Sequence, residues 1–322
     1  MTEITQNSDP SLPTTNEILS YIDQIPLPHE IKKSLWKSVG RLITGLVDVP
    51  VAYLEAKVQQ IRTEANALSL VTNRASEAAA KEFGQDQFLI DRTVNHFGSK
   101  LLREQINREK TVQLALQDLK VNPPKEDAKT EIDSDWLEMF SRIAETKSNE
   151  DVQLFLSKIL SGEIRNPGTF SPKTIQTLSL LDQSTGMIFQ SFCNVSFNIP
   201  QFEDALTCVI SEPFGAPGSN GLSPVGLSYT QLTQLQDAGL IQHDLTAWRQ
   251  FPTQLFQVPF TLGNKIFFYK LSADTPKDAI KVTIINFTKV GLELRKVIQS
   301  SYNPLYNEKF ETWILNKFKL LK

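Results

Sequence analysis

The side chains best suited to metal binding or nucleophilic catalysis are three histidines and two cysteines, and they are scattered along the chain. Cys193 and Cys208 lie fifteen positions apart, and His29, His96 and His243 fall in three separate regions. Zinc sites need Cys and His ligands in clusters with short spacings. No serine lies in the Gly-x-Ser-x-Gly pattern of many hydrolases. We therefore expect no catalytic residue, no metal ligand and no cofactor, and hence a protein that is not an enzyme.

Two groups of side chains repeat the Asp…Glu-x-Lys spacing of metal-dependent nucleases. They are Asp48, Glu55 and Lys57 in the first group and Asp135, Glu145 and Lys147 in the second. Both groups fall in segments whose sequence predicts helix, whereas strands carry these ligands in nucleases. We interpret both matches as chance.

Composition places the chain among ordinary globular proteins. Its 322 residues predict two or three folding units, and 40% hydrophobic with 21% charged residues is far from a disordered composition. Two cysteines are too few for a disulfide scaffold, and the polar, acidic N-terminus lacks the pattern of a secretion signal, so we expect a cytoplasmic protein. The most apolar stretch, residues 42–54, is too short to span a bilayer. A net charge of −3 shows no overall basic excess of the kind that nucleic-acid-binding proteins often carry.

Long helices are predicted in the first third of the chain. Residues 1–14 predict a disordered leader, and residues 15–122 a long-helix N-terminal domain. The segment 51–83 has eight alanines and neither glycine nor proline, which favours helix. A second long helix is expected from residue 87 to about residue 120.

The apolar side chains of this second helix suggest self-association. They include Phe88, Leu101 and Ile106, which we predict to form an oligomer contact, because long helices often bury a stripe against a copy of themselves. A stalk or bundle within one chain is the alternative.

The remaining chain predicts three further parts. Pro123 and Pro124 begin a linker over residues 123–131. Residues 132–200 predict a middle domain of four short, well-capped helices. Residues 201–322 mix strands with short helices. The expected fold class is thus mainly α with a small α+β part: a long-helix region, a short-helix bundle and a winged-helix-like C-terminal domain.

Two resemblances follow from particular segments. The helix ending at Gly239, followed by Leu240-Ile241, and the step from Phe287-Thr288 into the next helix resemble a winged-helix domain. The central block, from Trp136 through Leu160-Ser161-Gly162-Glu163-Ile164 to Asn166-Pro167-Gly168-Thr169-Phe170-Ser171, resembles a bacterial family described only as a domain of unknown function. That family has no established catalytic residues. The layout is also similar to abortive-infection proteins of bacterial phage defence.

These observations lead to one function hypothesis and two alternatives. The chain is predicted to be a non-enzymatic bacterial interaction protein, an oligomeric scaffold, sensor or subunit of a larger complex, with phage defence as its setting and a protein partner or itself as its ligand. The first alternative is a nucleic-acid-binding regulator that uses Gln231, Gln234 and Lys265 of the winged-helix-like domain, although a helix without Lys or Arg lacks phosphate anchors. The second is a membrane-acting effector that uses residues 30–60, where Trp36 and Arg41 lie on an amphipathic helix.

Overall fold

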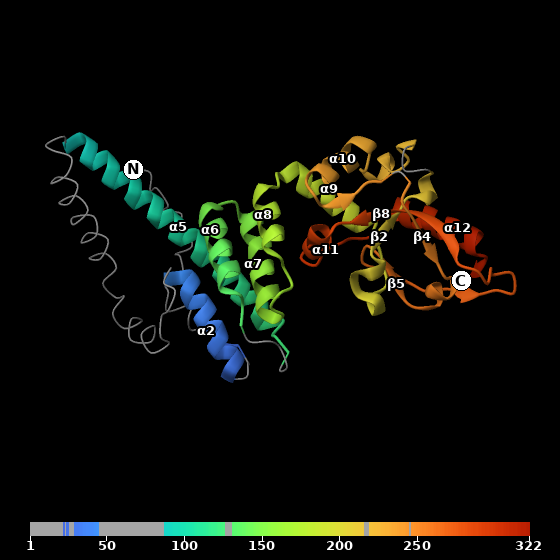
Figure 1. Cartoon of the computed structure of the whole chain (residues 1–322), viewed down its shortest axis with the longest axis horizontal. Helices are drawn as coiled ribbons and strands as arrows, with labels where there is room; N and C mark the ends of the chain where they lie inside the picture. The colour runs from blue at the N-terminus through green and yellow to red at the C-terminus, as the bar shows by residue number, and fades with distance from the viewer. Residues whose placement is uncertain are drawn as a thin grey trace, which may run out of the picture. The chain divides into compact units, whose positions relative to one another are not determined.

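The chain divides into two compact units, Met1–Phe170 and Ser171–Lys322, in a computed structural model (Figure 1). The structure describes residues 22, 24–25, 29–44, 87–125, 131–215, 219–244 and 246–322. The predicted leader at residues 1–14 and the predicted alanine-rich helix at residues 51–83 lie outside these residues.

The first unit is a helical bundle around the second half of one long helix. Its elements are α2 (His29–Thr44), α5 (Gln87–Val121), α6 (Ser134–Thr146) and α7 (Glu150–Arg165). The predicted helix at residues 87–120 is confirmed as α5, and α7, α6 and α2 all pack against it. Its buried stripe consists of Val112, Ala115, Leu116 and Leu119. In the predicted linker at residues 123–131, residues 123–125 are not helical and residues 126–130 lie outside the described residues.

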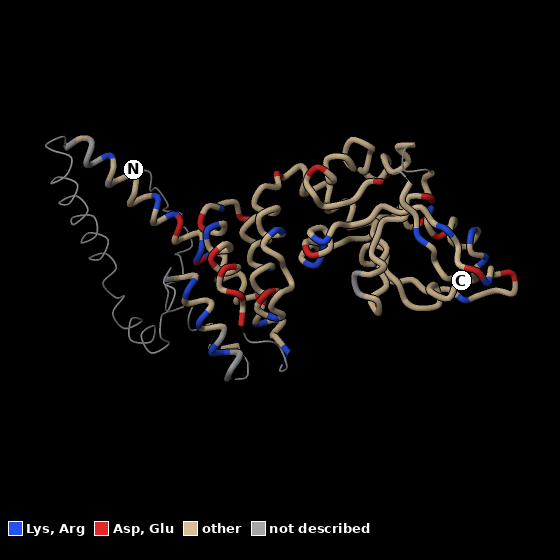
Figure 2. Tube along the Cα trace, viewed as in Figure 1, with Lys and Arg blue, Asp and Glu red and all other residues tan. Residues whose placement is uncertain are grey.

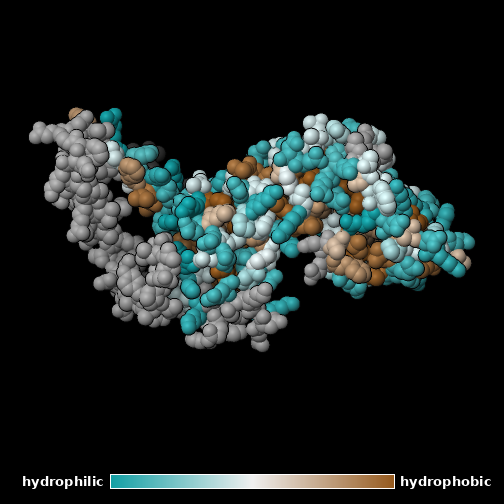
Figure 3. All heavy atoms as spheres, viewed as in Figure 1, coloured by the Kyte–Doolittle hydropathy of each residue, from teal (hydrophilic) through white to brown (hydrophobic). Residues whose placement is uncertain are grey.

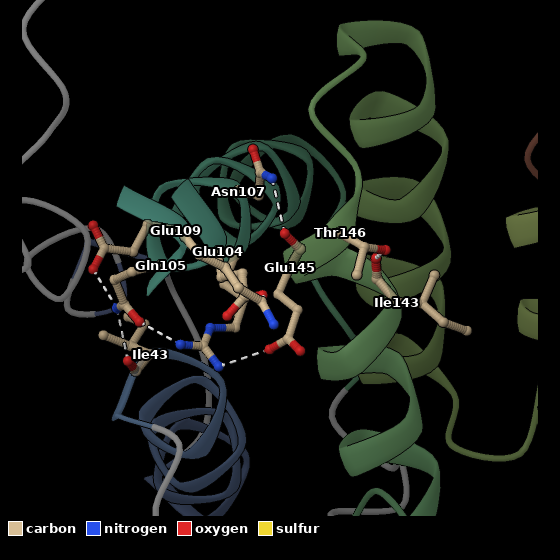
Figure 4. A network of polar contacts seen from close by, with 10 residues as sticks. Ile43, Glu104, Gln105, Asn107, Glu109, Ile143, Glu145 and Thr146 are labelled. Atoms are coloured by element: carbon tan, nitrogen blue, oxygen red, sulfur yellow. Dashed lines mark hydrogen bonds and ion pairs between the residues drawn. The ribbon is translucent and has the colours of Figure 1, made fainter. Parts of the chain in front are cut away.

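A polar network joins α2, α5 and α6 beside this apolar stripe (Figure 4). Gln105 of α5 donates to the carbonyl oxygen of Ile43 at 2.8 Å, which ties α2 to α5. The Arg108 guanidinium donates to Glu145 Oε2 at 3.1 Å and to Gln105 Oε1 at 2.6 Å. Asn107 Nδ2 donates to the carbonyl oxygen of Glu145 at 2.8 Å. The Glu145 of the nuclease-like spacing therefore contributes to helix packing.

The second unit combines helices with a seven-stranded antiparallel sheet in the order β3-β8-β2-β1-β5-β6, with β4 also paired to β8. The helices are α8 (Pro172–Leu180), α9 (Gln183–Asn194), α10 (Tyr229–Asp237), α11 (Lys289–Arg295) and α12 (Pro304–Phe318). The strands are β1 (Phe197–Asn198), β2 (Cys208–Ile210), β3 (Ile241–Gln242), β4 (Trp248–Phe251), β5 (Phe260–Leu262), β6 (Lys265–Phe267) and β8 (Ile280–Phe287). A separate pair is formed by β7 (Lys270–Leu271) and β9 (Leu320–Leu321).

Phenylalanine rings fill the space between the sheet and α12. Phe256 and Phe318 meet edge-to-face with their centroids 4.5 Å apart, and Phe260 and Phe310 are likewise fully buried. Such aromatic pairs add about 0.5–1.5 kcal/mol each to the burial of their area. These contacts hold α12 against β5 and against the 3-10 helix η6 (Thr253–Gln257).

The fold class expected from the sequence, mainly α with a small β part, is confirmed. The units nevertheless divide the chain elsewhere than the four-helix domain expected at residues 132–200. α6 and α7 pack on α5 in the first unit, whereas α8 packs on α11 and α9 packs on α10 in the second. Within the mix of strands and short helices expected at residues 201–322, Thr253–Gln257 forms the 3-10 helix η6, because Pro252 and Pro259 interrupt strand pairing there.

Both cysteines are buried in the second unit, Cys193 in α9 and Cys208 in β2. Burial raises the pKa of each thiol to about 12, because the charged thiolate would lose its hydration. Native chain treated with iodoacetamide at pH 8 should therefore show no labelled cysteine by mass spectrometry, while urea-unfolded chain should show two. Rapid labelling of either cysteine in the native chain would contradict this arrangement.

Candidate functional site

The central block of the sequence forms a packed loop at the end of α7. Glu163 is 2% exposed, and its two carboxylate oxygens accept from the backbone N–H groups of Gly168 at 2.5 Å and Phe170 at 2.9 Å. Trp136 Nε1 donates to the carbonyl oxygen of Phe170 at 2.7 Å. A Cβ on Gly162 would lie 2.8 Å from the Phe170 ring, so a larger residue there would displace this ring. The block therefore holds residues 166–170 in place, and its side chains act structurally.

A second buried carboxylate holds the start of α8. Glu293 Oε2, from α11, accepts from the Ser171 N–H and from the Thr174 hydroxyl, both at 2.6 Å. The Ser171 side chain makes no capping hydrogen bond to α8, and its hydroxyl lies 3.1 Å from the Thr174 hydroxyl. Glu293 supplies the negative charge that the helix N-terminus favours. This carboxylate too is committed to packing.

The predicted oligomer residues lie on α5, and the structure places two of them on its surface. Phe88 is 83% exposed and Leu101 is 58% exposed, whereas Ile106 is half-buried. At 100° per residue, Phe88 and Ile106 fall on one side of the helix. Leu101 falls with Phe97, which is 55% exposed, on the side that continues the buried stripe of α5. The three predicted residues therefore do not share one face, and Phe97 joins Leu101 as the clearer apolar pair.

The exposed apolar side chains of α5 interrupt an otherwise hydrophilic surface. Figure 3 shows them on the first half of the helix. Basic side chains, Arg92, Lys100 and Arg103, lie on the same segment. A stripe that is buried at one end of a helix and exposed at the other is a candidate contact surface.

The predicted contact residues of α10, Gln231 and Gln234, form hydrogen bonds within the second unit. Gln231 Oε1 accepts from the Ser228 N–H at 2.8 Å as part of a capping box. Gln234 Nε2 donates to the Thr185 hydroxyl at 2.8 Å. Lys265 lies on β6, at one edge of the sheet. α10 leads into β3, at the opposite edge, so Lys265 is not close to Gln231 and Gln234. These three residues therefore do not form one site.

A shallow hollow of about 540 Å³ lies where α9 meets α10. Its lining is uncharged and mixes polar and apolar side chains: Gln183, Ser184, Met187, Ile188, Ser191, Gly226 and Gln231. Met187 is 66% exposed there. Residues 171–245 contain one Lys or Arg and six Asp or Glu, so this region lacks cations for a phosphate backbone. The hollow suits a protein surface better than a nucleic acid.

The predicted membrane helix, α2, packs against other helices of the first unit. Trp36 of the predicted membrane helix is only 9% exposed, and α2 packs on α5 and α6. None of the helices that the structure describes is long and apolar enough to cross a membrane. Among the described residues, no group of three or more His, Cys, Asp or Glu is placed to hold a metal ion.

Comparison with known proteins finds a match to a family model. The model of a family described as "Protein of unknown function (DUF2806)" matches residues 91–311, which run from α5 into α12. No curated protein matches the chain, and no solved structure does.

Proposed function

The chain belongs to the DUF2806 family of proteins of unknown function, and from its geometry we propose that it is a non-enzymatic interaction protein that self-associates as an oligomeric scaffold. The resemblance expected from the central block is thereby confirmed at the level of the family. The similarity to abortive-infection proteins, a phage-defence setting and a cytoplasmic location stay predictions.

The exposed apolar pair of α5 carries this proposal. Phe97 and Leu101 continue the stripe that α2, α6 and α7 bury further along the same helix. Burying one such side chain contributes about 1.5–3 kcal/mol relative to exposure. A second copy of α5 presents the same stripe, so an isologous contact between two copies would remove both from water.

The second unit supplies a separate contact surface in this proposal. The strand order β2-β8-β3, with α10 leading through Gly239 into β3 and β8 leading into α11, supports the winged-helix-like interpretation. Gly239 has φ +73°, which ends α10 at the expected residue. Because α10 has no Lys or Arg and its glutamines are hydrogen-bonded within the unit, we favour a protein ligand for the α9–α10 hollow over duplex DNA.

Charged substitutions on α5 test the self-association. The double variant Phe97→Glu, Leu101→Glu should weaken association at least about 100-fold, since it removes two buried apolar groups and places like charges against each other. Light scattering should then give the monomer mass of 36.3 kDa at concentrations where the unsubstituted chain is larger.

Leu180→Glu is the matched control, because Leu180 is also an exposed apolar helix residue but lies in the second unit and outside the α9–α10 hollow. This variant should keep the mass of the unsubstituted chain. If the α5 double variant keeps that mass too, the proposed surface is wrong.

A further inference from the structure

β6 forms one edge of the sheet in the second unit. The strand order ends there, and within the described part of the chain no strand pairs with its outer side. On its inner side β6 pairs with β5, to which it is joined by the two-residue turn Gly263-Asn264. The paired residues, starting at the turn, are Leu262 with Lys265, Thr261 with Ile266 and Phe260 with Phe267. The last strand of a sheet presents a row of main-chain groups that no neighbouring strand satisfies.

The N–H and C=O groups of Ile266 belong to that row. In a two-residue hairpin the residues that flank the turn, here Leu262 and Lys265, form a hydrogen-bonded pair. Hydrogen-bonded and non-hydrogen-bonded pairs alternate along an antiparallel ladder, so Thr261 and Ile266 are a non-hydrogen-bonded pair. The main-chain groups of Ile266 therefore point away from β5, toward the free edge.

Phe268 continues the row. The Tyr269 N–H turns back toward the sheet and donates to the carbonyl oxygen of Phe256 at 2.9 Å. Because the direction of the main-chain groups alternates along an extended chain, those of Phe268 point outward, like those of Ile266. No hydrogen bond between described residues reaches these groups. Two donors and two acceptors are thus open to an added strand.

The side chains of Ile266 and Phe268 are apolar and lie in water. They are 67% and 64% exposed, and residues two apart in an extended chain share a face. Proteins usually cover or charge such an edge, because an uncovered apolar edge strand pairs readily with another chain. β6 thus combines the two features that strand addition uses: unpaired main-chain groups and side chains that the added strand would cover.

The charge around this edge is positive. Residues 252–272 contain Lys265 and Lys270 but neither Asp nor Glu, and residues 246–322 contain twelve Lys and Arg against five Asp and Glu. Figure 2 shows Lys and Arg positions along α12 and near the strands beside it. Lys265 Nζ lies 4.8 Å from the centroid of the Tyr302 ring, a contact that leaves its charge in place, and Lys270 is exposed.

This charge distinguishes between occupants of the edge. No carboxylate among the described residues pairs with Lys265 or Lys270. A second copy of β6 would bring like charges together, whereas an acidic segment would complement both lysines.

We propose that β6 binds an extended acidic peptide of a partner protein as an added strand. Hydrogen bonds to the main chain of Ile266 and Phe268 hold the peptide, and their side chains cover its apolar residues. The lysines select acidic residues at the positions between. This surface differs from α5 and from the α9–α10 hollow, because β6 lies at the opposite edge of the sheet from β3, into which α10 leads.

Fluorescence anisotropy on the full chain, with a labelled peptide of about ten residues in which Glu and Val alternate, tests the proposal. This peptide should bind more tightly than a peptide of alternating Lys and Val, and the difference should shrink as salt rises. Two derivatives carry N-methyl groups on every Val nitrogen or on every Glu nitrogen. Because alternate N–H groups of a strand face opposite edges, one derivative should lose binding and the other should keep it.

Substitutions in the chain locate the binding site. The double variant Ile266→Ala, Phe268→Ala should weaken binding of the Glu–Val peptide about tenfold or more, because two apolar contacts are lost. Lys265→Gln should weaken it about two- to fivefold at low salt. Leu180→Ala is the matched control, since Leu180 is an exposed apolar residue of the same unit on α8, and it should leave the affinity unchanged.

Four results would overturn the proposal: no binding of the Glu–Val peptide, equal binding of the Lys–Val peptide, equal behaviour of the two N-methylated derivatives, or full affinity in the double alanine variant. Light scattering tests the second copy as occupant. If the Phe97→Glu, Leu101→Glu variant stays above 36.3 kDa until Ile266 and Phe268 are also replaced, the edge pairs with a copy of itself and the proposal is wrong. Peptide binding measured on that variant is independent of association through α5.

Discussion

Replacing Gly291 with alanine is expected to destabilise the second unit by about 3 kcal/mol or more. A Cβ on Gly291 would lie 2.0 Å from the carbonyl oxygen of Leu240 and 3.2 Å from the Phe287 ring. The obstacle is a backbone atom, so a side-chain rotation cannot relieve it. Leu240 is also fixed by its neighbours, because its carbonyl oxygen accepts from the Thr288 N–H at 3.0 Å. The α10–β3 turn and the β8–α11 step must therefore separate, and the midpoint of urea unfolding should fall sharply.

Gly186→Ala is the matched control for this prediction. Gly186 lies inside α9, and nothing comes within 4 Å of a Cβ placed there. Alanine has the higher helix propensity by about 1 kcal/mol, so this variant should be as stable as the unsubstituted chain or slightly more stable. Equal stability of Gly291→Ala and Gly186→Ala would show that the two segments do not meet as described.

The isosteric change Glu163→Gln should lower the free energy of unfolding by about 2–4 kcal/mol. Both carboxylate oxygens of Glu163 accept from backbone N–H groups, so the amide of glutamine must turn an N–H donor toward another donor. The site is buried, so water is excluded from replacing the lost hydrogen bond. Urea unfolding followed by far-UV circular dichroism measures the change, and trypsin should cleave the altered chain sooner near Arg165.

Glu138→Gln serves as the comparison, because Glu138 is an exposed residue of the same unit that pairs with Arg142 on the helix surface. Surface ion pairs of this kind contribute little, so stability should change by no more than about 0.5 kcal/mol. If Glu163→Gln is as mild as Glu138→Gln, then Glu163 does not hold the loop that follows α7.

N-cap residues and the spacing of apolar residues predicted the helices of the first unit. Asp133 and Asn149 accept from the N–H groups of Trp136 and Val152, so the caps expected for α6 and α7 are present. Spacing of apolar residues predicted α5 within about one residue at its C-terminal end. These features depend on neighbours within a few positions, which the sequence displays directly.

The arrangement of these elements depended on contacts that no local pattern displays. The Ser171 and Thr174 groups meet Glu293 more than one hundred positions later, and that contact assigns α8 to the second unit. Gln234 fitted a base-reading role by residue type, but its partner Thr185 lies 49 positions away. The separation of Lys265 from α10 follows from the strand order, which secondary-structure patterns do not fix.

Light scattering on the unsubstituted full chain, over a concentration series up to about 100 μM, tests the proposed scaffold most directly. We predict a mass that rises to at least twice the monomer value of 36.3 kDa and a matching mass in moderate salt, since the α5 contact is apolar. A mass that stays at 36.3 kDa across the whole series would contradict self-association through α5 and with it the proposed function.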